Sequence, residues 1–357
     1  MKRFHYALIT AAFAALLLSA CGSADTDTAG SSGDNSLVVL NYGKYLDASA
    51  IKMFEQETGI KIKLEEYESP EEMYTKFSAG SISYDVVCTS DYMVERLIHE
   101  GKVAPIDFSS FSYYKNLNPA ILAAAEVFDP QNQYSMPYFY GTLGILYNTT
   151  MVSEKETESW NILWDDRYRD TIIMQNSVRD SFVPALRLLG RDINTEDETD
   201  LRDALSLLVE QKPLVYAYYV DETADEMIAG NAALALVYSG EAATAMESNA
   251  DLSYTVPKEG SNLWIDSWFI PKSCTNQTNA LKFLNFLCKD DIAEKNFEYV
   301  QYASPITSVV ENQDADVKNN EAINPSSDTI KRCEIYKALS DDDSAKYTKL
   351  WQELLSY

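Results

Sequence analysis

The strongest constraint on the fold of this chain is the alternation of short apolar runs with amphipathic segments. The runs 37–41 and 84–89 have the length and content of buried strands, and 60–64 alternates apolar and charged residues as a half-buried strand does. The segment 47–59 opens on an acidic residue and stops at a glycine, and 91–99 has helical spacing as well. Strands that alternate with helices predict a parallel sheet with covered faces. We therefore expect an α/β fold.

The rest of the chain continues this pattern and is too long for one small core. About 320 residues follow Ser36, a length that favours two domains. No internal repeat is evident. The further elements that we predict are strands at 171–174 and 232–238 and helices at 70–77, 180–190, 240–247, 278–288, 329–339 and 344–355.

The N-terminus has the pattern of a bacterial secretory signal. Lys2 and Arg3 precede an apolar run, and Leu18-Ser19-Ala20-Cys21 resembles a lipobox, whose cysteine is lipidated after cleavage. We predict a signal peptide at 1–20 and a lipid-anchored flexible linker at 21–36, where no large apolar residue occurs. The alternatives are an uncleaved anchor helix, although the apolar run is shorter than the ~20 residues of a bilayer span, and an ordinary signal with a chance cysteine. The expected location is outside the cytoplasm, on a bacterial membrane, either in the periplasm or on the outer face of the cell.

The charge of the chain excludes some classes of partner. The formal net charge is −26, and it becomes −28 without residues 1–20, which hold Lys2 and Arg3 and no acidic residue. Such a field repels nucleic acids and anionic lipid head groups and attracts cations. We expect a monomer that binds no nucleic acid.

Histidine and cysteine are scarce, which narrows the possible chemistry. Beyond the signal the only histidine is His99, so multi-histidine zinc sites are excluded and a catalytic triad would depend on that one residue. The sequence has no phosphate-binding loop, dinucleotide fingerprint or nucleophile elbow. We predict no metal, no cofactor and no catalytic residue. Four cysteines follow Cys21 and allow three pairings, and we expect mostly buried thiols, with one disulfide possible, among Cys88, Cys274, Cys288 and Cys333.

Aromatic rings gather next to hydroxyl, amide and carboxylate groups where the predicted strands end. The segments that combine these groups are 41–45, 89–92, 238–241 and 263–268. Ligands of open α/β sheets bind at the carboxyl ends of the strands. These segments therefore predict one ligand site.

At these segments the chain resembles the extracytoplasmic spermidine/putrescine-binding proteins of polyamine ABC importers. The resemblance covers about residues 37–357 and rests on the order of many short motifs rather than on one of them. The motifs are Asn41-Tyr42 with Tyr45, 54–61, Tyr67-Glu68-Ser69 with Met73-Tyr74, 84–87, 128–130, 135–138, 257–260, 264–267 and Ile270-Pro271.

The resemblance implies a two-lobe periplasmic-binding-protein fold of type II. In this fold the ligand lies in a cleft between two α/β lobes that crossover strands join. The boundaries implied here are 37–142 with 267–310 for lobe one, 143–266 with 311–357 for lobe two, and crossovers near 140–142 and 264–266.

The resemblance also implies a function and a set of ligand contacts. The expected function is that of a lipid-anchored receptor, not an enzyme, which binds spermidine or putrescine and passes it to the permease subunits of an ABC transporter. Asp266 would bind a central or terminal amine, and Asp180 would bind the far amine. The residues that the resemblance places around the ligand are Tyr42, Tyr45, Ser90, Tyr92, Asp180, Tyr238, Trp264, Asp266, Tyr302 and Tyr336.

The chemistry of these residues agrees with a polyamine. Its ammonium groups need partners of opposite charge when they leave water, and aromatic faces cover the methylenes and attract the cations. An anion would call for arginines or helix N-termini instead.

Some residues depart from the family pattern, and other interpretations stay open. The family commonly has Trp where this chain has Tyr42 and Tyr238, Asp in place of Ser177, and Glu in place of Asp180. This chain therefore offers one carboxylate fewer at that end, which leaves the preferred polyamine open. Asp180 and Ser90 could also be simple helix caps. The alternative functions are a receptor for another small solute, an extracellular hydrolase that uses paired carboxylates, and a structural surface lipoprotein.

Overall fold

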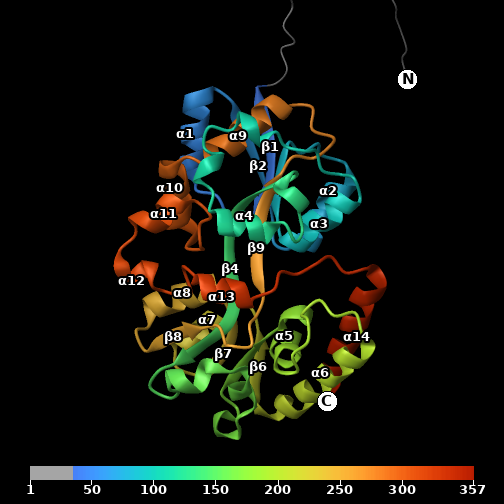
Figure 1. Ribbon diagram of the computed structural model, residues 1–357, viewed down its shortest axis with the longest axis vertical. Helices are drawn as coiled ribbons and strands as arrows, with labels where there is room; N and C mark the ends of the chain where they lie inside the picture. Colours follow the sequence, from blue (N-terminus) through green and yellow to red (C-terminus); the bar gives the residue numbers. More distant parts are fainter. Residues whose placement is uncertain (1–34) are drawn as a thin grey trace, which may run out of the picture. The chain divides into compact units, whose positions relative to one another are not determined.

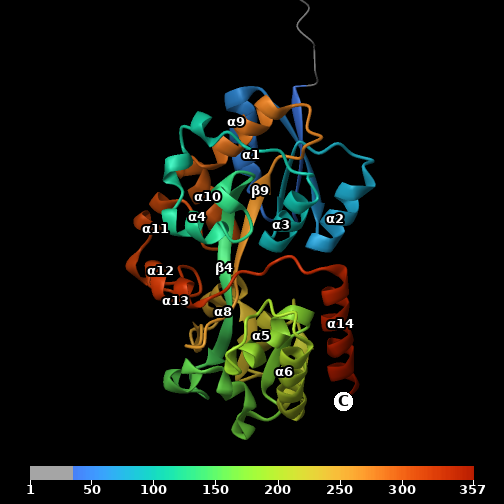
Figure 2. The same ribbon diagram turned by 45° about the vertical axis from the view of Figure 1, so that its right-hand side comes forward.

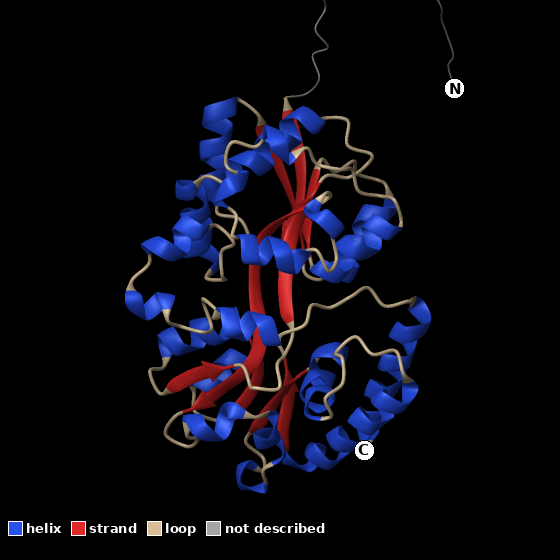
Figure 3. Ribbon diagram, in the orientation of Figure 1, coloured by secondary structure: helices blue, strands red, loops and turns tan. Residues whose placement is uncertain are grey.

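The computed structural model describes residues 35–357 and contains one mixed sheet with helices on its faces (Figures 1 and 3). The predicted signal peptide, Cys21 and nearly all of the predicted linker lie outside the described residues. Along the sheet the strands follow the order β2-β1-β3-β9-β4-β7-β5-β6, and β8 pairs with β4. The strands are β1 Ser36–Tyr42, β2 Lys61–Tyr67, β3 Val86–Thr89, β4 Ser135–Asn148, β5 Ile172–Gln175, β6 Val215–Tyr219, β7 Leu234–Tyr238, β8 Leu252–Thr255 and β9 Leu263–Phe269.

The helices lie between these strands and at the C-terminus. The α-helices are α1 Ala48–Thr58, α2 Pro70–Ala79, α3 Asp91–His99, α4 Pro119–Ala125, α5 Val178–Leu188, α6 Glu198–Gln211, α7 Thr223–Ile228, α8 Ser239–Ser248, α9 Gln277–Leu287, α10 Asp290–Val300, α11 Thr307–Asn312, α12 Ala315–Lys318, α13 Ser327–Arg332 and α14 Asp341–Ser356. Short 3₁₀ segments are Phe108–Ser110, Tyr114–Asn116, Pro130–Asn132, Glu154–Glu158, Trp160–Trp164, Asp166–Tyr168 and Lys212–Leu214. In residues 35–357 we find no helix with the length and apolar content that a membrane crossing requires.

Local sequence signals explain the first elements. The side chain of Asp47 caps α1 by accepting hydrogen bonds from the amides of Ser49 and Ala50, and Gly59 ends the helix at φ 72°. A residue with a side chain is strained at that φ, so the glycine fixes where the chain turns back into β2. β1, β2 and β3 pair in parallel, as the alternation predicts.

The sheet is mixed rather than wholly parallel, which corrects the prediction. The reason is that β4 and β9 run antiparallel to each other and continue through both lobes (Figures 1 and 2). β4 pairs with β9 over Ser135–Thr142 and then with β7 and β8 over Leu143–Asn148, and all its residues are buried. β3 pairs with β9 at the other edge. Two crossover strands therefore join a lobe built on β1–β3 to a lobe built on β5–β8.

The C-terminal part of the chain packs on the lobe built on β5–β8 (Figure 2). Tyr347, Trp351 and Leu354 of α14 are buried among residues of α5 and α6. The helix predicted at 329–339 is wrong beyond its first turn, because α13 ends at Arg332. The backbone of Glu334 instead pairs with Ser261 and Leu263 beside β9, so this segment crosses the molecule in an extended form.

The four described cysteines are free, so the disulfide considered possible is absent from them. Cys88, Cys274 and Cys288 are buried, and Cys333 is half-buried. The expectation of mostly buried thiols is therefore confirmed.

Candidate ligand-binding site

One large cavity contains all ten residues named as ligand contacts. Its volume is about 1020 Å³. Its walls come from the ends of β1, β3 and β7, from the crossover strand β9, and from the first turns of α3, α5 and α8. The strand ends therefore converge at one place, as the sequence predicts. The predicted residues on its wall are Tyr42, Tyr45, Ser90, Tyr92, Asp180, Tyr238, Trp264, Asp266, Tyr302 and Tyr336.

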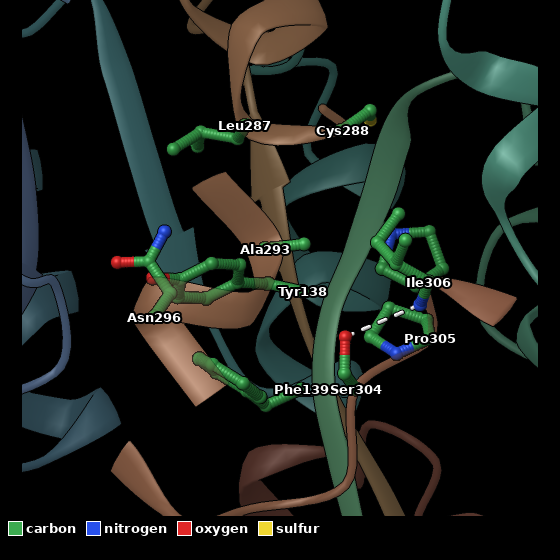
Figure 4. A pocket seen from close by; sticks show the side chains of 10 residues that line it. Tyr138, Phe139, Leu287, Cys288, Ala293, Asn296, Ser304, Pro305 and Ile306 are labelled. Carbon is green, nitrogen blue, oxygen red and sulfur yellow. Dashed lines mark hydrogen bonds between the residues drawn. The ribbon is translucent and has the colours of Figure 1, made fainter. Parts of the chain in front are cut away.

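A second cavity in the structure is far smaller. It measures about 10 Å³, the space of about one water molecule. Figure 4 shows Tyr138, Asn296 and Cys288 around it, together with the hydrogen bond that the Ile306 amide donates to the Ser304 hydroxyl at 3.2 Å. This cavity is too small for a solute beyond water.

Asp266 lies in a part of the cavity wall that we call the Asp266 end, and tyrosine hydroxyls hold it in place. Tyr45 donates a 2.6 Å hydrogen bond to its carboxylate, and Tyr42 donates a longer one of 3.5 Å. Burial raises the pKa of Asp266 to about 6, although the two hydroxyls lower it. Burial and the Asp266 charge also raise the pKa of both tyrosines, so their hydroxyls remain donors. A cation that enters here meets a carboxylate that is already oriented.

Aromatic rings form a continuous wall from this end. The ring centroids of Tyr42 and Tyr45 lie 5.2 Å apart, those of Tyr45 and Tyr302 lie 5.9 Å apart, and those of Tyr302 and Trp264 lie 5.1 Å apart, all edge to face. Gly240 makes the position of Tyr302 possible, because a Cβ on Gly240 would stand only 1.5 Å from the Tyr302 ring. Such a wall suits an apolar chain that carries positive charge.

Asp180 lies in another part of the wall, which we call the Asp180 end, and is bound by three hydroxyls. Ser177 donates a hydrogen bond of 2.6 Å, Tyr336 donates one of 2.9 Å, and Tyr238 donates a short third bond. Asp180 is 3% exposed and lies in the first turn of α5, whose N-cap residue is Ser177. The cap interpretation of Asp180 therefore has no support in the hydrogen bonds of this helix.

Ser90 and Tyr92 lie at the start of α3. Ser90 occupies the N-cap position without a side-chain capping bond, so the cap interpretation does not explain its hydroxyl either. Tyr92 donates from its hydroxyl to Glu71 at 3.0 Å.

Two carboxyl groups of this cavity lie in segments that the sequence assigned to the site, but they were not named as ligand contacts. Glu241 lies in the first turn of α8, and its Oε2 is buried without a hydrogen-bond partner in the described chain. Burial, together with the charges of Asp221 and Asp180, raises the pKa of Glu241 to about 7. Glu241 is the last residue of the segment 238–241, which the sequence had already assigned to the site, and this position was the available signal.

The second missed carboxyl group is Asp91, which connects α3 to the crossover strand. It accepts hydrogen bonds from the amides of Tyr92 at 2.7 Å and Ile265 at 3.2 Å. It is 1% exposed, and burial raises its pKa to about 8. Asp91 therefore anchors the backbone on either side of the site, next to Tyr92 and next to Asp266.

The acidic groups are not arranged as ligands of a metal ion. Within residues 35–357 no group of three His, Cys, Asp or Glu side chains is placed to hold one. The carboxylates at the two ends instead bind phenol and serine hydroxyls. This arrangement suits an organic cation that accepts aromatic contact.

Comparison with known proteins gives the same family for most of the chain. Residues 49–325 match the family described as bacterial extracellular solute-binding protein. The spermidine/putrescine-binding periplasmic protein of Salmonella typhimurium is 33% identical over 355 residues, which is 99% of each chain. The protein of the same name from Escherichia coli is 32% identical over 335 residues, covering 94% of this chain and 93% of its own.

A solved structure agrees with the fold as well. The crystal structure of the spermidine/putrescine ABC transporter substrate-binding protein PotD from Streptococcus pneumoniae, in complex with calcium and HEPES, aligns with a TM-score of 0.83. It shares 36% identity and covers 90% of this chain and 99% of its own. The two-lobe fold and the sequence matches lead to one assignment. The chain belongs to the bacterial extracellular solute-binding protein family.

Proposed function

We propose that this protein is an extracytoplasmic receptor that binds a polyamine and delivers it to the permease subunits of an ABC importer. The observation that carries the proposal is one cavity that is lined by the carboxylates Asp266 and Asp180 and by a wall of aromatic rings. The relatives named as spermidine/putrescine-binding proteins support the same ligand class. Binding without turnover is part of the proposal.

The electrostatics of the cavity favour a cation over an anion or a neutral solute. Buried carboxylates are costly unless a positive charge or hydrogen bonds compensate them. At both ends the hydroxyl donors fill only part of each carboxylate's capacity for hydrogen bonds. An ammonium group supplies the remaining donors and the missing charge.

The three carboxyl groups Asp266, Asp180 and Glu241 favour three ammonium groups. Glu241 lines the same cavity as Asp266 and Asp180, and its Oε2 is buried without a hydrogen-bond partner among the described residues. Glu241 can therefore pair with a third amine. Ser177, where the family commonly has Asp, orients Asp180 rather than adding a charge. We infer a triamine such as spermidine as the preferred ligand, with putrescine as the weaker one.

A direct experiment compares spermidine with the diamine of equal length in which a methylene replaces the central amine. The proposal predicts tighter binding of spermidine, and E241Q should remove most of that preference. A matched control is Glu247→Gln on α8, since Glu247 is exposed. Equal binding of the two amines by the unaltered protein would contradict the role of Glu241, and binding of neither would contradict the ligand class.

We also propose the lipid anchor and the lobe boundaries that the sequence implies. Cys21 would be the lipidated N-terminus of the mature chain and would attach it to the membrane. Packing of α10 against α1 and of α14 against α6 supports lobes at 37–142 with 267–310 and at 143–266 with 311–357. Replacement of Cys21 by Ala should release the protein from the membrane fraction and abolish labelling by a radioactive fatty acid, whereas retention of both would refute the anchor.

A further inference from the structure

Arg179 places a positive charge in the wall of a cavity whose other ionisable groups are mostly acidic. It is the second residue of α5, directly before Asp180, and both line the cavity. The proposed function gives no role to this residue. A cation beside a cation-binding carboxylate requires an explanation, because it competes with the ligand for the same negative field.

Hydrogen bonds fix the guanidinium in place. It donates to the carbonyl of Lys337 at 2.9 Å and to the side-chain oxygen of Asn194 at 2.7 Å. Asn194 also accepts from the amide of Lys337 and donates to the carbonyl of Ile335. Arg179 is thus tied to the extended segment that carries Tyr336.

The same guanidinium covers the ring of Tyr336. Its central carbon lies 3.9 Å from the ring centroid, in cation–π contact. That face of Tyr336 is therefore occupied by a cation of the protein itself. Tyr336 is left to act through its hydroxyl, which donates to Asp180 at 2.9 Å.

The charge of Arg179 is not neutralised by a direct partner. The guanidinium contacts a carbonyl, an amide oxygen and a ring, and its Nε is buried without a partner. Among residues 35–357 Arg179 forms no ion pair. Its field nevertheless reaches the buried carboxyl of Asp91, whose pKa it lowers against the effect of burial. An unpaired cation in a low-dielectric wall acts over several ångströms.

We propose that Arg179 is a specificity-determining residue that limits the ligand to one ammonium group at the Asp180 end of the cavity. This inference rests on the proposed function. One ammonium is compensated by Asp180, whereas a further ammonium near Tyr336 would approach the Arg179 charge, which lies over the ring of Tyr336. A fixed repulsive charge of this kind selects against longer ligands without strengthening the binding of the preferred one. The residue therefore discriminates against tetramines such as spermine.

The test is the ratio of the dissociation constants of spermine and spermidine, measured calorimetrically on the purified protein and its variants. R179Q removes the charge and keeps a hydrogen-bonding side chain, and it should lower the ratio by about tenfold or more. R179K keeps the charge and should leave the ratio close to that of the unaltered protein. Arg202→Gln is the matched control, because Arg202 lies outside the cavity and is paired with Glu198 at 3.1 Å.

The outcomes separate this inference from the proposed function. If Arg179 acts only through its hydrogen bonds to Lys337 and Asn194, R179Q should weaken the binding of spermine and spermidine alike. The ratio of the two dissociation constants would then stay unchanged, and this result would overturn the inference. An equal fall of the ratio in R179Q and R179K would also overturn it, since charge would then not be the cause. If the unaltered protein binds neither amine, the proposed function fails, and the inference fails with it.

Discussion

The hydroxyl of Tyr45 donates a 2.6 Å hydrogen bond to the carboxylate of Asp266. Tyr45 follows β1, whereas Asp266 lies on the crossover strand β9, so the bond joins two segments that are 221 residues apart in the sequence. Tyr138 supports it by donating to the backbone carbonyl of Tyr45 at 2.9 Å. The carboxylate is thus oriented before any ligand arrives, a feature that lowers the entropic cost of binding.

Replacement of Asp266 by Asn should weaken spermidine binding by about 2–4 kcal/mol, or about 30- to 1000-fold. The substitution keeps the shape of the side chain but removes the charge that compensates a buried ammonium. Isothermal titration calorimetry measures the effect. Asp316→Asn on the exposed face of α12 provides a control that should change nothing. Unaltered affinity in the folded D266N variant would show that Asp266 is not a ligand contact.

Replacement of Tyr45 by Phe should raise the pKa of Asp266 above its present value of about 6, because the lost hydrogen bond is one that lowers it. A larger fraction of Asp266 is then protonated and neutral near pH 7. We expect Y45F to bind spermidine about tenfold more weakly near pH 7 and to recover part of this loss near pH 8.5. A loss that is the same at both pH values would mean that Tyr45 acts by packing alone.

Affinity and stability should depend on pH in opposite directions. Burial raises the pKa values of Asp266 to about 6, Glu241 to about 7 and Asp91 to about 8. The ligand needs charged carboxylates, so affinity should fall as the pH decreases from about 8 to about 5. In the ligand-free folded protein these three carboxyl groups bind protons more tightly than they do in the unfolded chain. The free energy of unfolding of the ligand-free protein should therefore increase as the pH decreases from about 8 to about 5.

Calorimetry and urea unfolding at several pH values check both trends. The D266N and E241Q variants should show flatter dependences, because each lacks one of the titrating groups. An affinity that increases toward acidic pH would contradict the proposed pairing of carboxylates with ammonium groups.

Replacement of Gly240 by Ala should displace Tyr302 from the aromatic wall, since the new Cβ would stand 1.5 Å from its ring. We expect spermidine binding to weaken by about tenfold or more through lost cation–π contact. Stability should fall by about 1–3 kcal/mol, because the added methyl group overpacks the site. Gly43→Ala is a control with nothing within 4 Å of the new Cβ. In a Y302A background G240A should have no further effect, and a full effect there would refute the mechanism.

Much of the first lobe and the location of the site could be predicted from local sequence. Hydrophobic runs and a glycine stop define β1, β2 and α1, and those signals need no knowledge of distant residues. Rings and carboxyl groups such as Tyr42 and Asp266 stand at strand ends or on a crossover strand, so topology alone brings them together.

The predictions that failed concern residues whose structure depends on contacts with residues far away in the sequence. The residues after Arg332 have helical character, but the backbone of Glu334 pairs with Ser261 and Leu263, and Arg187 forms an ion pair with its side chain. These contacts outweigh the local preference for a helix. Glu241 was missed for the same kind of reason, because an acidic residue in the first turn of a helix is ordinary, and its burial becomes visible only in the folded protein.

The decisive measurement of whether this protein binds a polyamine is calorimetric titration of the purified protein with spermidine, putrescine, spermine and cadaverine. We expect spermidine to bind in the micromolar range or tighter, at about −8 kcal/mol or better, and more tightly than the other three. No heat of binding and no thermal stabilisation with any of the four amines would contradict it.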